Sequence, residues 1–358
     1  MNNFNTHLLP YYLIHLFTYL VFPSFCDIII LRDILYLPLP KYERGIVMDY
    51  TNLTKDEYLK LYEEPLEELI NISHKITLEN FDNTVEACSI ISAKTGECSE
   101  NCKYCAQSKH NHAEIECHPL LDVETVKKAA LSAKENGATR FCIVTSGRVP
   151  TGKDFEKILE MIKAVASIDG IHCCASLGLL SEEQVKQIKE AGVERFNHNI
   201  NTSENYHSKI CTTHTFQDRV NTVKMITKHG MEACCGVIIG MGESREDRVD
   251  MALSLKELNP KTVPINFLNP IKGTPLEDYE NKIDEEEILK TICIFRMILP
   301  KAMLRYAGGR TTRLSEYNQK IGIIAGINSL LVGNYLTTCG SKSEEDKKML
   351  GELDLVMA

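Results

Sequence analysis

The sequence predicts an α/β fold, a (β/α)8 barrel of the TIM type with an N-terminal helical segment. First, eight short β-like runs follow one another from about residue 87 onward. Second, an amphipathic stretch with helical spacing lies between most neighbouring runs, which is typical of parallel strands joined by crossover helices. Third, the chain has 358 residues, 44% of them hydrophobic, which is enough for the roughly 250 residues of such a barrel.

The first expected element is a helix, with Thr54 as its N-cap and Glu57 completing a capping box. Leu59, Leu61, Leu66 and Ile70 continue it at roughly helical spacing. The expected strands are Ala87–Ala93, Arg140–Thr145, His172–Leu177, Arg195–Asn199, Ala233–Ile239, Thr262–Phe267, Lys301–Arg305 and Gly326–Leu331. The helices expected between them are Val123–Asn136, Phe155–Ala166, Glu182–Ala191, Gln217–His229, Arg245–Leu258 and Glu285–Ile298. In such barrels the chemistry lies at the C-terminal ends of the strands.

The first 47 residues differ from the rest of the chain. The apolar run Tyr11–Phe22 is shorter than the roughly 20 residues that a bilayer span needs, and no Lys or Arg precedes it as in a signal peptide. We hypothesise that translation starts at or near Met48. The expected division is an apolar appendage at 1–47, a helical segment at 48–85, the barrel at 86–340 and a polar C-terminal tail at 341–358.

Charge and cysteine content limit the function classes. The 40 basic and 49 acidic residues give a net charge of -9, with no basic block, which argues against nucleic acid or an anionic membrane as the partner. Fourteen cysteines in a chain of this length do not indicate a secreted disulfide framework. A cytoplasmic protein with this many thiols more often uses them to bind metal.

The most specific motif lies directly after the first expected strand, where Cys98, Cys102 and Cys105 follow the spacing Cys-x3-Cys-x2-Cys. Three thiolates in one short loop can hold one face of a cubane iron–sulfur cluster and leave one iron open for a small molecule. The alternatives are a zinc site with a distant fourth ligand, or coincidence in a cysteine-rich chain. The position after the first barrel strand and the aromatic Tyr104 before the third cysteine favour the cluster.

This loop resembles that of the radical S-adenosylmethionine (SAM) superfamily. The resemblance implies that the three thiolates hold a [4Fe-4S] cluster, whose fourth iron binds the amino and carboxylate groups of SAM. It also implies that one electron from the cluster cleaves SAM to a 5′-deoxyadenosyl radical. Tyr104 would then pack against the adenine.

The remaining chain resembles the biotin synthase family over roughly residues 52–340. The matching stretches are Tyr104–Ser108, Thr139–Cys142, Cys174–Gly178, Phe196–Asn199, Gly236–Glu243, Val263–Phe267, Arg305–Arg310 and Leu336–Thr338. The resemblance implies insertion of sulfur between C6 and C9 of dethiobiotin, with a [2Fe-2S] cluster as the sulfur donor. It also implies a flavodoxin or ferredoxin as electron donor, and a homodimer.

The resemblance assigns the [2Fe-2S] cluster four residues on four different expected strands: Cys142, Cys174, Cys234 and Arg305. Cysteines on separate strands converge only if they point into the barrel, and the alternative is that they are small buried apolar residues. Neighbours on a strand face opposite sides, so Cys173 and Cys235 are expected to be packing residues. The other cysteines match nothing in the family and are expected in the core or on the surface: Cys26, Cys88, Cys117, Cys211, Cys293 and Cys339.

Three asparagines two residues apart, Asn197, Asn199 and Asn201, would face one side of a continued strand. The resemblance implies that Asn199 and Asn201 contact the ribose of SAM, and that Asn197 and Asn199 contact the ureido ring of dethiobiotin. Many family members carry Asp at the position of Asn201, so weaker SAM binding is expected from the loss of a charge-assisted hydrogen bond. The alternative is that these asparagines are turn residues.

The resemblance assigns five further contacts. Arg219 would pair with the carboxylate of SAM, although alone it would be read as a solvated helix arginine, and Ile238 would contact the adenine. Asn266 would hold the ureido group of the substrate. Thr337 and Thr338 would meet its carboxylate tail.

Two other functions compete with this interpretation. One is a related barrel that performs rearrangement or cofactor-assembly chemistry, and such barrels typically lack the complete deep ligand set. The other is a non-catalytic iron–sulfur or zinc protein, which would not need Asn199, Arg219 and Asn266.

Overall fold

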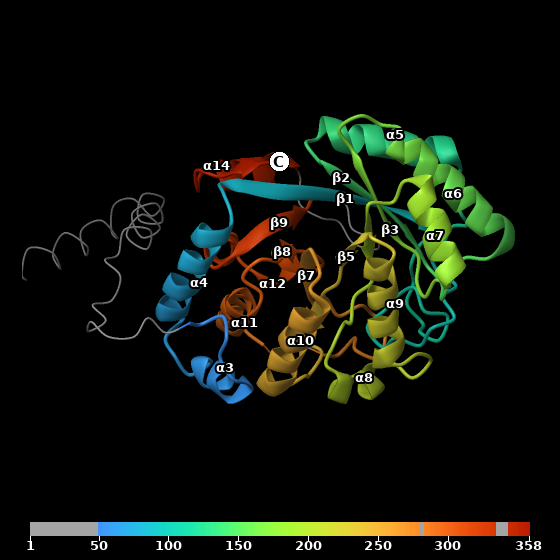
Figure 1. Cartoon of the computed structure of the whole chain (residues 1–358). Helices are drawn as coiled ribbons and strands as arrows, with labels where there is room; N and C mark the ends of the chain where they lie inside the picture. The colour runs from blue at the N-terminus through green and yellow to red at the C-terminus, as the bar shows by residue number, and fades with distance from the viewer. Residues whose placement is uncertain (1–48, 280–282, 334–342) are drawn as a thin grey trace, which may run out of the picture. The chain divides into compact units, whose positions relative to one another are not determined.

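The computed structural model describes residues 49–279, 283–333 and 343–358, which contain a closed barrel of parallel strands surrounded by helices (Figure 1). The (β/α)8 prediction is therefore confirmed. The expected appendage lies outside the described residues, and so do Thr337 and Thr338. None of the helices in the described part of the chain has the length and apolar content that a bilayer crossing requires.

Every strand pairing in the barrel is parallel. β1 pairs with both β2 and β9, and this double pairing closes the ring. The strands of the wall are β1 (Thr84–Lys94), β2 (Arg140–Thr145), β3 (His172–Ser176), β4 (Arg195–Asn197), β5 (Glu232–Cys234), β6 (Val237–Ile239), β7 (Thr262–Phe267), β8 (Met303–Tyr306) and β9 (Ile327–Leu331).

The expectation of one continuous strand over Ala233–Ile239 is wrong, because β5 and β6 are separate and share one barrel position. The interruption lies at Gly236, where a Cβ atom would meet the carbonyl oxygen of Pro264 at 1.9 Å. The backbone N–H of Gly236 instead donates to Oδ1 of Asn199 at 2.9 Å. The chain thus loses ladder hydrogen bonds at Gly236. In their place, its backbone packs closely against β7 and fixes the side chain of Asn199 just after β4.

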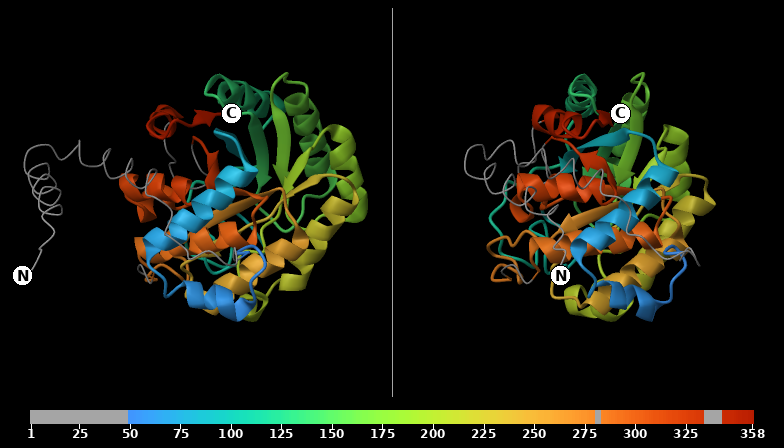
Figure 2. Two further views of the ribbon diagram at one scale, coloured as in Figure 1. Left: turned by 60° about the vertical axis from the view of Figure 1, so that its left-hand side comes forward. Right: turned by 90° about the vertical axis from the view of Figure 1, so that its left-hand side faces the viewer.

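The helices lie outside the strands in all three views (Figures 1 and 2). Capping boxes begin three of the barrel helices, with the pairs Ser181 and Gln184, Thr215 and Asp218, and Ser244 and Asp247. The helices around the barrel are α5 (Val123–Glu135), α6 (Gly152–Ala166), α7 (Glu182–Ala191), α8 (Glu204–Ile210), α9 (Phe216–Lys228), α10 (Arg245–Leu258), α11 (Glu285–Ile298), α12 (Arg310–Arg313) and α13 (Glu316–Ile324).

Two helices precede the barrel, so the expectation of one helix continuing through Leu66 is wrong: the first helix ends at Leu61, and the second helix begins directly after Pro65. In α3 (Lys55–Leu61) the side chains of Thr54 and Glu57 form the predicted capping box. The next helix, α4 (Leu66–Asn80), packs on α11 through its buried apolar residues.

The segment expected to be a polar C-terminal tail forms a helix, α14 (Ser343–Gly351), and a short strand, β10 (Val356–Met357). β10 pairs in parallel with the first residues of β1, and the backbone of Ala358 accepts a hydrogen bond from the N–H of Ala87 at 2.9 Å. A buried ion pair between Arg310 and Asp346, 2.6 Å apart, fastens α14 to the barrel. These contacts place the end of the chain directly beside the strand that carries Glu86.

Candidate functional site

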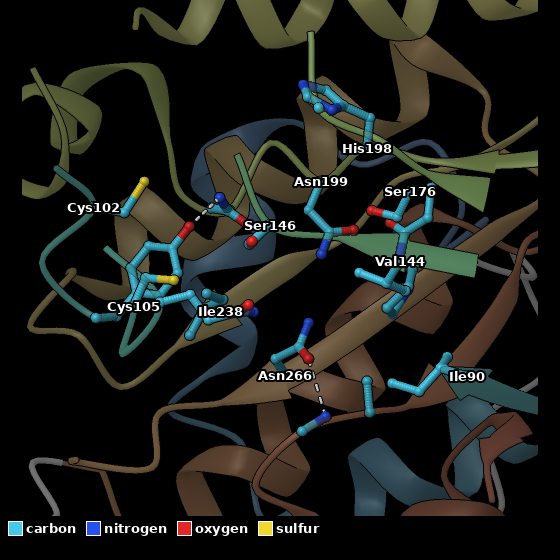
Figure 3. Close-up of a pocket in the computed structure, with 18 of the residues that line it drawn as sticks. Ile90, Cys102, Cys105, Val144, Ser146, Ser176, His198, Asn199, Ile238 and Asn266 are labelled. Carbon is cyan, nitrogen blue, oxygen red and sulfur yellow. Dashed lines mark hydrogen bonds between the residues drawn. The ribbon is translucent and has the colours of Figure 1, made fainter. Parts of the chain in front are cut away.

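One cavity of about 450 Å³ opens at the C-terminal ends of the barrel strands and reaches into the barrel. In Figure 3, Cys102 and Cys105 lie on one side of it, Val144 and Ile90 on the other, and Asn266 between them. The structure brings every described member of the predicted site to its wall: Cys98, Cys102, Tyr104, Cys105, Cys142, Cys174, Asn197, Asn199, Asn201, Arg219, Cys234, Ile238, Asn266 and Arg305. Cys173 and Cys235 are buried and do not line it.

The thiol loop at the mouth is held in place by its own backbone. Cys98 donates its N–H to Gln107 at 3.0 Å and accepts from the N–H of Lys109 at 2.9 Å. The side-chain amide of Asn111 donates to the carbonyl oxygens of Cys102 and Cys105, at 3.1 and 2.8 Å. The loop therefore has a fixed shape that does not depend on contacts of the three thiols.

A second segment, just after α8, supports this loop. The side-chain oxygen of Asn101 accepts from the N–H of Thr213 at 3.2 Å. The carboxylate of Glu100 accepts from the hydroxyl of Thr213, from Arg148 and from Nδ1 of His214. Burial alone would raise the pKa of Glu100, but these hydrogen bonds lower it below its usual value. Glu100 is therefore ionised at neutral pH.

Arg219 lies in the cavity wall and is not a solvated helix arginine. Its Nε donates to Nε2 of His214 at 2.9 Å, and one Nη donates to the carbonyl of Asn199 at 2.9 Å. Because Nε2 of His214 accepts, its proton is on Nδ1, which donates to Glu100. This chain of contacts fixes a cation beside the thiol loop.

Cys211 is a member of the mouth region that sequence analysis missed. Its Sγ lies 3.7 Å from Sγ of Cys102 and 3.4 Å from Nδ1 of His214. The three ligand atoms of Cys102, Cys211 and His214 lie within 4.8 Å of one another, but both ring nitrogens of His214 are engaged, by Glu100 and by Arg219, so a metal ion would first have to displace one of these contacts. The only sequence signal was the short spacing between Cys211 and His214.

The asparagines after β4 are positioned by backbone contacts. Asn201 has a left-handed backbone with φ of 68°, and its side-chain amide donates to the hydroxyl of Tyr104 at 2.5 Å. Oδ1 of Asn199 accepts from Gly236, as described above. The segment is therefore a shaped turn, which agrees with the turn interpretation of its backbone, while all three side chains still line the cavity.

Asn266 and Ile238 lie between the mouth and the interior. The amide nitrogen of Asn266 donates to the carbonyl of Val237 at 3.0 Å, and its oxygen accepts from Gly308 at 3.0 Å. Ile238 packs with Tyr104 in an apolar cluster. This part of the wall thus presents an amide beside an apolar surface.

The deep end of the cavity is a group of buried thiols. Cys142 and Cys174 lie in register on β2 and β3, and both pack against Cys88. Burial raises the pKa of Cys142 and Cys174 well above the usual value, and raises that of Cys234 to about 11. Metal binding at these thiols must therefore displace their protons.

A carboxylate that sequence analysis missed organises the charges beneath these thiols. Glu86 lies within 2.6 Å of Arg140, 2.8 Å of Arg195 and 2.6 Å of Arg305. Burial alone would raise the pKa of Glu86, but the charges of Arg305, Arg195 and Arg140 together lower it to about 2. The sequence did contain a signal for Glu86. It is a charged residue at an inward-facing position of an apolar strand, two residues before Cys88.

The donor sets fit two iron–sulfur clusters. Each end of the cavity offers at least three thiols, and thiolate sulfur is the usual protein ligand of such clusters. The cavity also holds one unused polar atom, because Nε2 of His198 is buried without a hydrogen-bond partner within the described part of the chain. Burial and the nearby Arg219 lower the pKa of His198 well below its usual value, so a bound molecule would meet a neutral imidazole.

Comparisons with known proteins agree with this geometry. The profile of the radical SAM superfamily matches residues 93–255, and that of the Biotin and Thiamin Synthesis associated domain matches residues 264–356. The chain is 48% identical over 305 residues to a biotin synthase of Acetivibrio thermocellus, covering 85% of this chain and 94% of that protein. Biotin synthases of Clostridium perfringens (43% over 303 residues, 85% and 94% covered) and Brachyspira hyodysenteriae (41% over 327 residues, 91% and 96% covered) are also similar.

Solved structures at lower identity share the fold. Methylornithine synthase has a TM-score of 0.74 at 20% identity, covering 86% of this chain and 94% of that one. The FeFe-hydrogenase maturase of Carboxydothermus hydrogenoformans has a TM-score of 0.75 at 16% identity, covering 94% and 80%. At these identities the similarity supports the barrel and carries no conclusion about chemistry.

Proposed function

We propose that this chain, which belongs to the biotin synthase family of the radical SAM superfamily, inserts sulfur between C6 and C9 of dethiobiotin to form biotin. The observation that carries the proposal is a single cavity with three thiols at its mouth, at least three in its interior and amide side chains between them. A rearrangement enzyme would not need the interior thiols. A metal store would not need the amides.

Each thiol group would hold one cluster. Cys98, Cys102 and Cys105 would bind the [4Fe-4S] cluster. Cys142, Cys174, Cys234 and Arg305 would bind the [2Fe-2S] cluster. When bound, the first cluster and SAM supply a 5′-deoxyadenosyl radical, and the second cluster supplies the sulfur.

At the mouth, the side chains of this chain would orient SAM. Arg219 is fixed by His214 and Asn199, so it offers its charge to the carboxylate of SAM without losing much side-chain freedom. Asn199 and Asn201 would contact the ribose. Tyr104 and Ile238 would cover the adenine, and their packing supports an apolar surface there.

Between the two clusters, the chain would orient the substrate and exclude water. Asn197, Asn199 and Asn266 would hydrogen-bond the ureido ring, and the fixed amide of Asn266 supports this placement. Hydrogen abstraction by a radical requires no general base, so the neutral imidazole of His198 would not transfer a proton in the reaction. C6 and C9 of dethiobiotin would then lie between the mouth and the buried thiols.

Three further properties belong to the same proposal. A flavodoxin or ferredoxin would reduce the mouth cluster, which is supported by the partial exposure of Cys98 and Cys105. The cysteines that the structure describes are free thiols, which supports a reducing compartment such as the cytoplasm. A homodimer is proposed from family membership alone.

An anaerobic single-turnover assay tests the proposal. The reconstituted chain is mixed with SAM, a strong reductant and dethiobiotin, and mass spectrometry measures biotin and 5′-deoxyadenosine together. Biotin with bleaching of the [2Fe-2S] absorption is expected. Deoxyadenosine without biotin would move the substrate elsewhere, and neither product in protein that holds both clusters would contradict the whole function.

A further inference from the structure

Cys211 is a buried thiol directly beside one of the three thiols at the mouth of the cavity. Its Sγ lies 3.7 Å from Sγ of Cys102, and the two residues are only 4% and 7% exposed. The S–H of Cys211 donates to Oδ1 of Asn101 at 3.3 Å, which keeps its sulfur beside the thiol loop. Two thiols at this distance can undergo a reaction that neither can undergo alone.

The backbone sets the two cysteines opposite each other. On one side of them, Lys103 donates its N–H to the carbonyl of Ile210 at 3.0 Å. On the other side, Oδ1 of Asn101 accepts from the N–H of Thr212 at 2.9 Å. The two segments therefore run in opposite directions, and the cysteines face each other between these contacts.

This arrangement is compatible with a disulfide bond. Residues opposite each other in antiparallel segments have Cα atoms about 4.5–5.5 Å apart, which lies inside the range that disulfides span. The S–S bond is about 2.0 Å long, so the two sulfurs need to approach by roughly 1.7 Å, which rotation of the side chains can supply. The hydrogen bonds of Asn101 and Lys103 to the facing segment need not change.

The two thiols differ in their access to the cavity. Cys102 lines the cavity at its mouth (Figure 3), whereas Cys211 does not belong to the cavity wall. A small oxidant that enters the cavity therefore reaches the sulfur of Cys102 first, and Cys211 lies next to the oxidised atom. Reactive cysteines are often paired in this way with a second, resolving cysteine.

We propose that Cys102 and Cys211 form an oxidative modification site, in which Cys211 converts oxidised Cys102 into a reversible disulfide when the mouth cluster is absent. The oxidant is hydrogen peroxide. It oxidises the Cys102 thiol to a sulfenic acid, and its O–O bond breaks to release one water. The Cys211 thiol then attacks this sulfur. The S–S bond forms, the S–O bond breaks, and the hydroxyl group leaves with the proton of Cys211 as a second water.

The disulfide would protect the site before a cluster is inserted. Without a resolving thiol, a sulfenic acid is oxidised further to a sulfinic acid, which thiols do not reduce. A disulfide is instead reduced by thiol exchange, which restores both thiols. The inference rests on the proposed function, because that function makes Cys102 a ligand of the [4Fe-4S] cluster.

The test uses the full-length chain, which is reduced and freed of iron anaerobically and then treated with hydrogen peroxide. Trypsin releases Cys102 in peptide 95–103 and Cys211 in peptide 210–219, so the disulfide links these two peptides. Mass spectrometry without reductant detects the linked pair. Fragmentation of the chain between Cys98 and Cys102 assigns the sulfur that carries the link.

Two variants separate this reaction from packing. Cys211→Ser removes the resolving sulfur, and Cys173→Ala is the matched control, because Cys173 is a buried thiol on β3 that does not line the cavity. Before peroxide, both variants are expected to assemble the mouth cluster as the wild type does. After peroxide and then dithiothreitol, the wild type and Cys173→Ala are expected to rebuild it. Cys211→Ser is expected to carry two added oxygen atoms on Cys102 and to lose most of this recovery, measured by electron paramagnetic resonance of the reduced cluster.

The proposal is overturned if the oxidised wild type lacks the linked peptides, or if Cys102 is joined to Cys98 or Cys105 instead. Equal recovery of the cluster in Cys211→Ser and the wild type would also overturn it. So would a Cys211→Ser chain that assembles no mouth cluster before peroxide, since Cys211 would then belong to the cluster site itself. A chain that forms the disulfide but no biotin contradicts only the proposed function, and a wild type that holds no cluster at the mouth overturns both.

Discussion

The two ends of the cavity carry the same kind of ligand but are built differently. At the mouth, three thiols come from one short loop whose shape is set by neighbouring backbone hydrogen bonds. In the interior, Cys142, Cys174 and Cys234 come from three strands, and only closure of the barrel brings them together. The mouth is thus a local structure, whereas the interior depends on the whole fold and on charges buried beneath it.

The largest expected effects are on product formation, and they differ between variants of the mouth and variants of the interior. Cys102→Ala is expected to abolish formation of 5′-deoxyadenosine and biotin alike, because it removes a ligand of the cluster that binds SAM. Cys142→Ala is expected to abolish biotin but leave SAM cleavage. Mass spectrometry of both products measures the difference, and Cys293→Ala, a buried thiol on α11, is the control. Loss of SAM cleavage in Cys142→Ala would mean that the two ends do not act separately.

The next effect tests how far the interior depends on buried charge. Glu86→Gln removes the carboxylate that Arg140, Arg195 and Arg305 share, and is expected to lower the free energy of unfolding by about 3 kcal/mol. Arg305 loses its carboxylate partner, while Arg140 and Arg195 still face Glu232. The deep cluster is expected to be lost and the mouth cluster kept. Anaerobic urea denaturation and iron analysis measure both. Glu232→Gln is the control, because Glu232 contacts Arg140 and Arg195 as Glu86 does, but its side chain is 40% exposed.

The same carboxylate predicts a pH dependence. The pKa of Glu86 is about 2 in the folded chain and 4.5 in its ordinary state, so its stabilisation is complete above the higher value. It is lost as the pH falls from about 4.5 toward about 2. The difference in unfolding free energy between wild type and Glu86→Gln should shrink over this range. A constant difference would show that Glu86 does not act through its charge.

A substitution of Asn266, which lies between the mouth and the interior of the cavity, tests whether this residue contacts dethiobiotin or SAM. Asn266→Ala is expected to raise KM for dethiobiotin roughly tenfold, which corresponds to one lost hydrogen bond, with little change in KM for SAM. Steady-state kinetics with each substrate varied in turn measures the two constants. An equal rise in both would place Asn266 in the SAM site.

The smallest expected effect concerns the mouth alone. Asn201→Asp replaces a neutral acceptor with a carboxylate, and is expected to tighten SAM binding by about fivefold through charge-assisted hydrogen bonds to the ribose. Anaerobic equilibrium binding of SAM measures the change. Weaker binding would indicate that the hydrogen bond from Asn201 to Tyr104 matters more than the contact with the ribose.

The difference between the two ends also explains what could be predicted from sequence. The strands, most helices and the loop of Cys98, Cys102 and Cys105 follow from local spacing, which a sequence displays directly. Cys88, Glu86 and Cys211 were missed because their partners come from other strands or loops, and no local pattern reports those contacts. The break at Gly236 was missed for the same reason, since its cause is the approach of Pro264.

The pairing of β1 also determines the order in which the protein can be completed during synthesis. β1 emerges first among the barrel strands, but its partners β9 and β10 are made last. Until then Glu86 and Cys88 stand on a strand whose ladder is incomplete, and such an edge is open to pairing with other chains. Assembly of the interior therefore waits for the last strands of the barrel, whereas the loop at the mouth can form as soon as its own residues have left the ribosome.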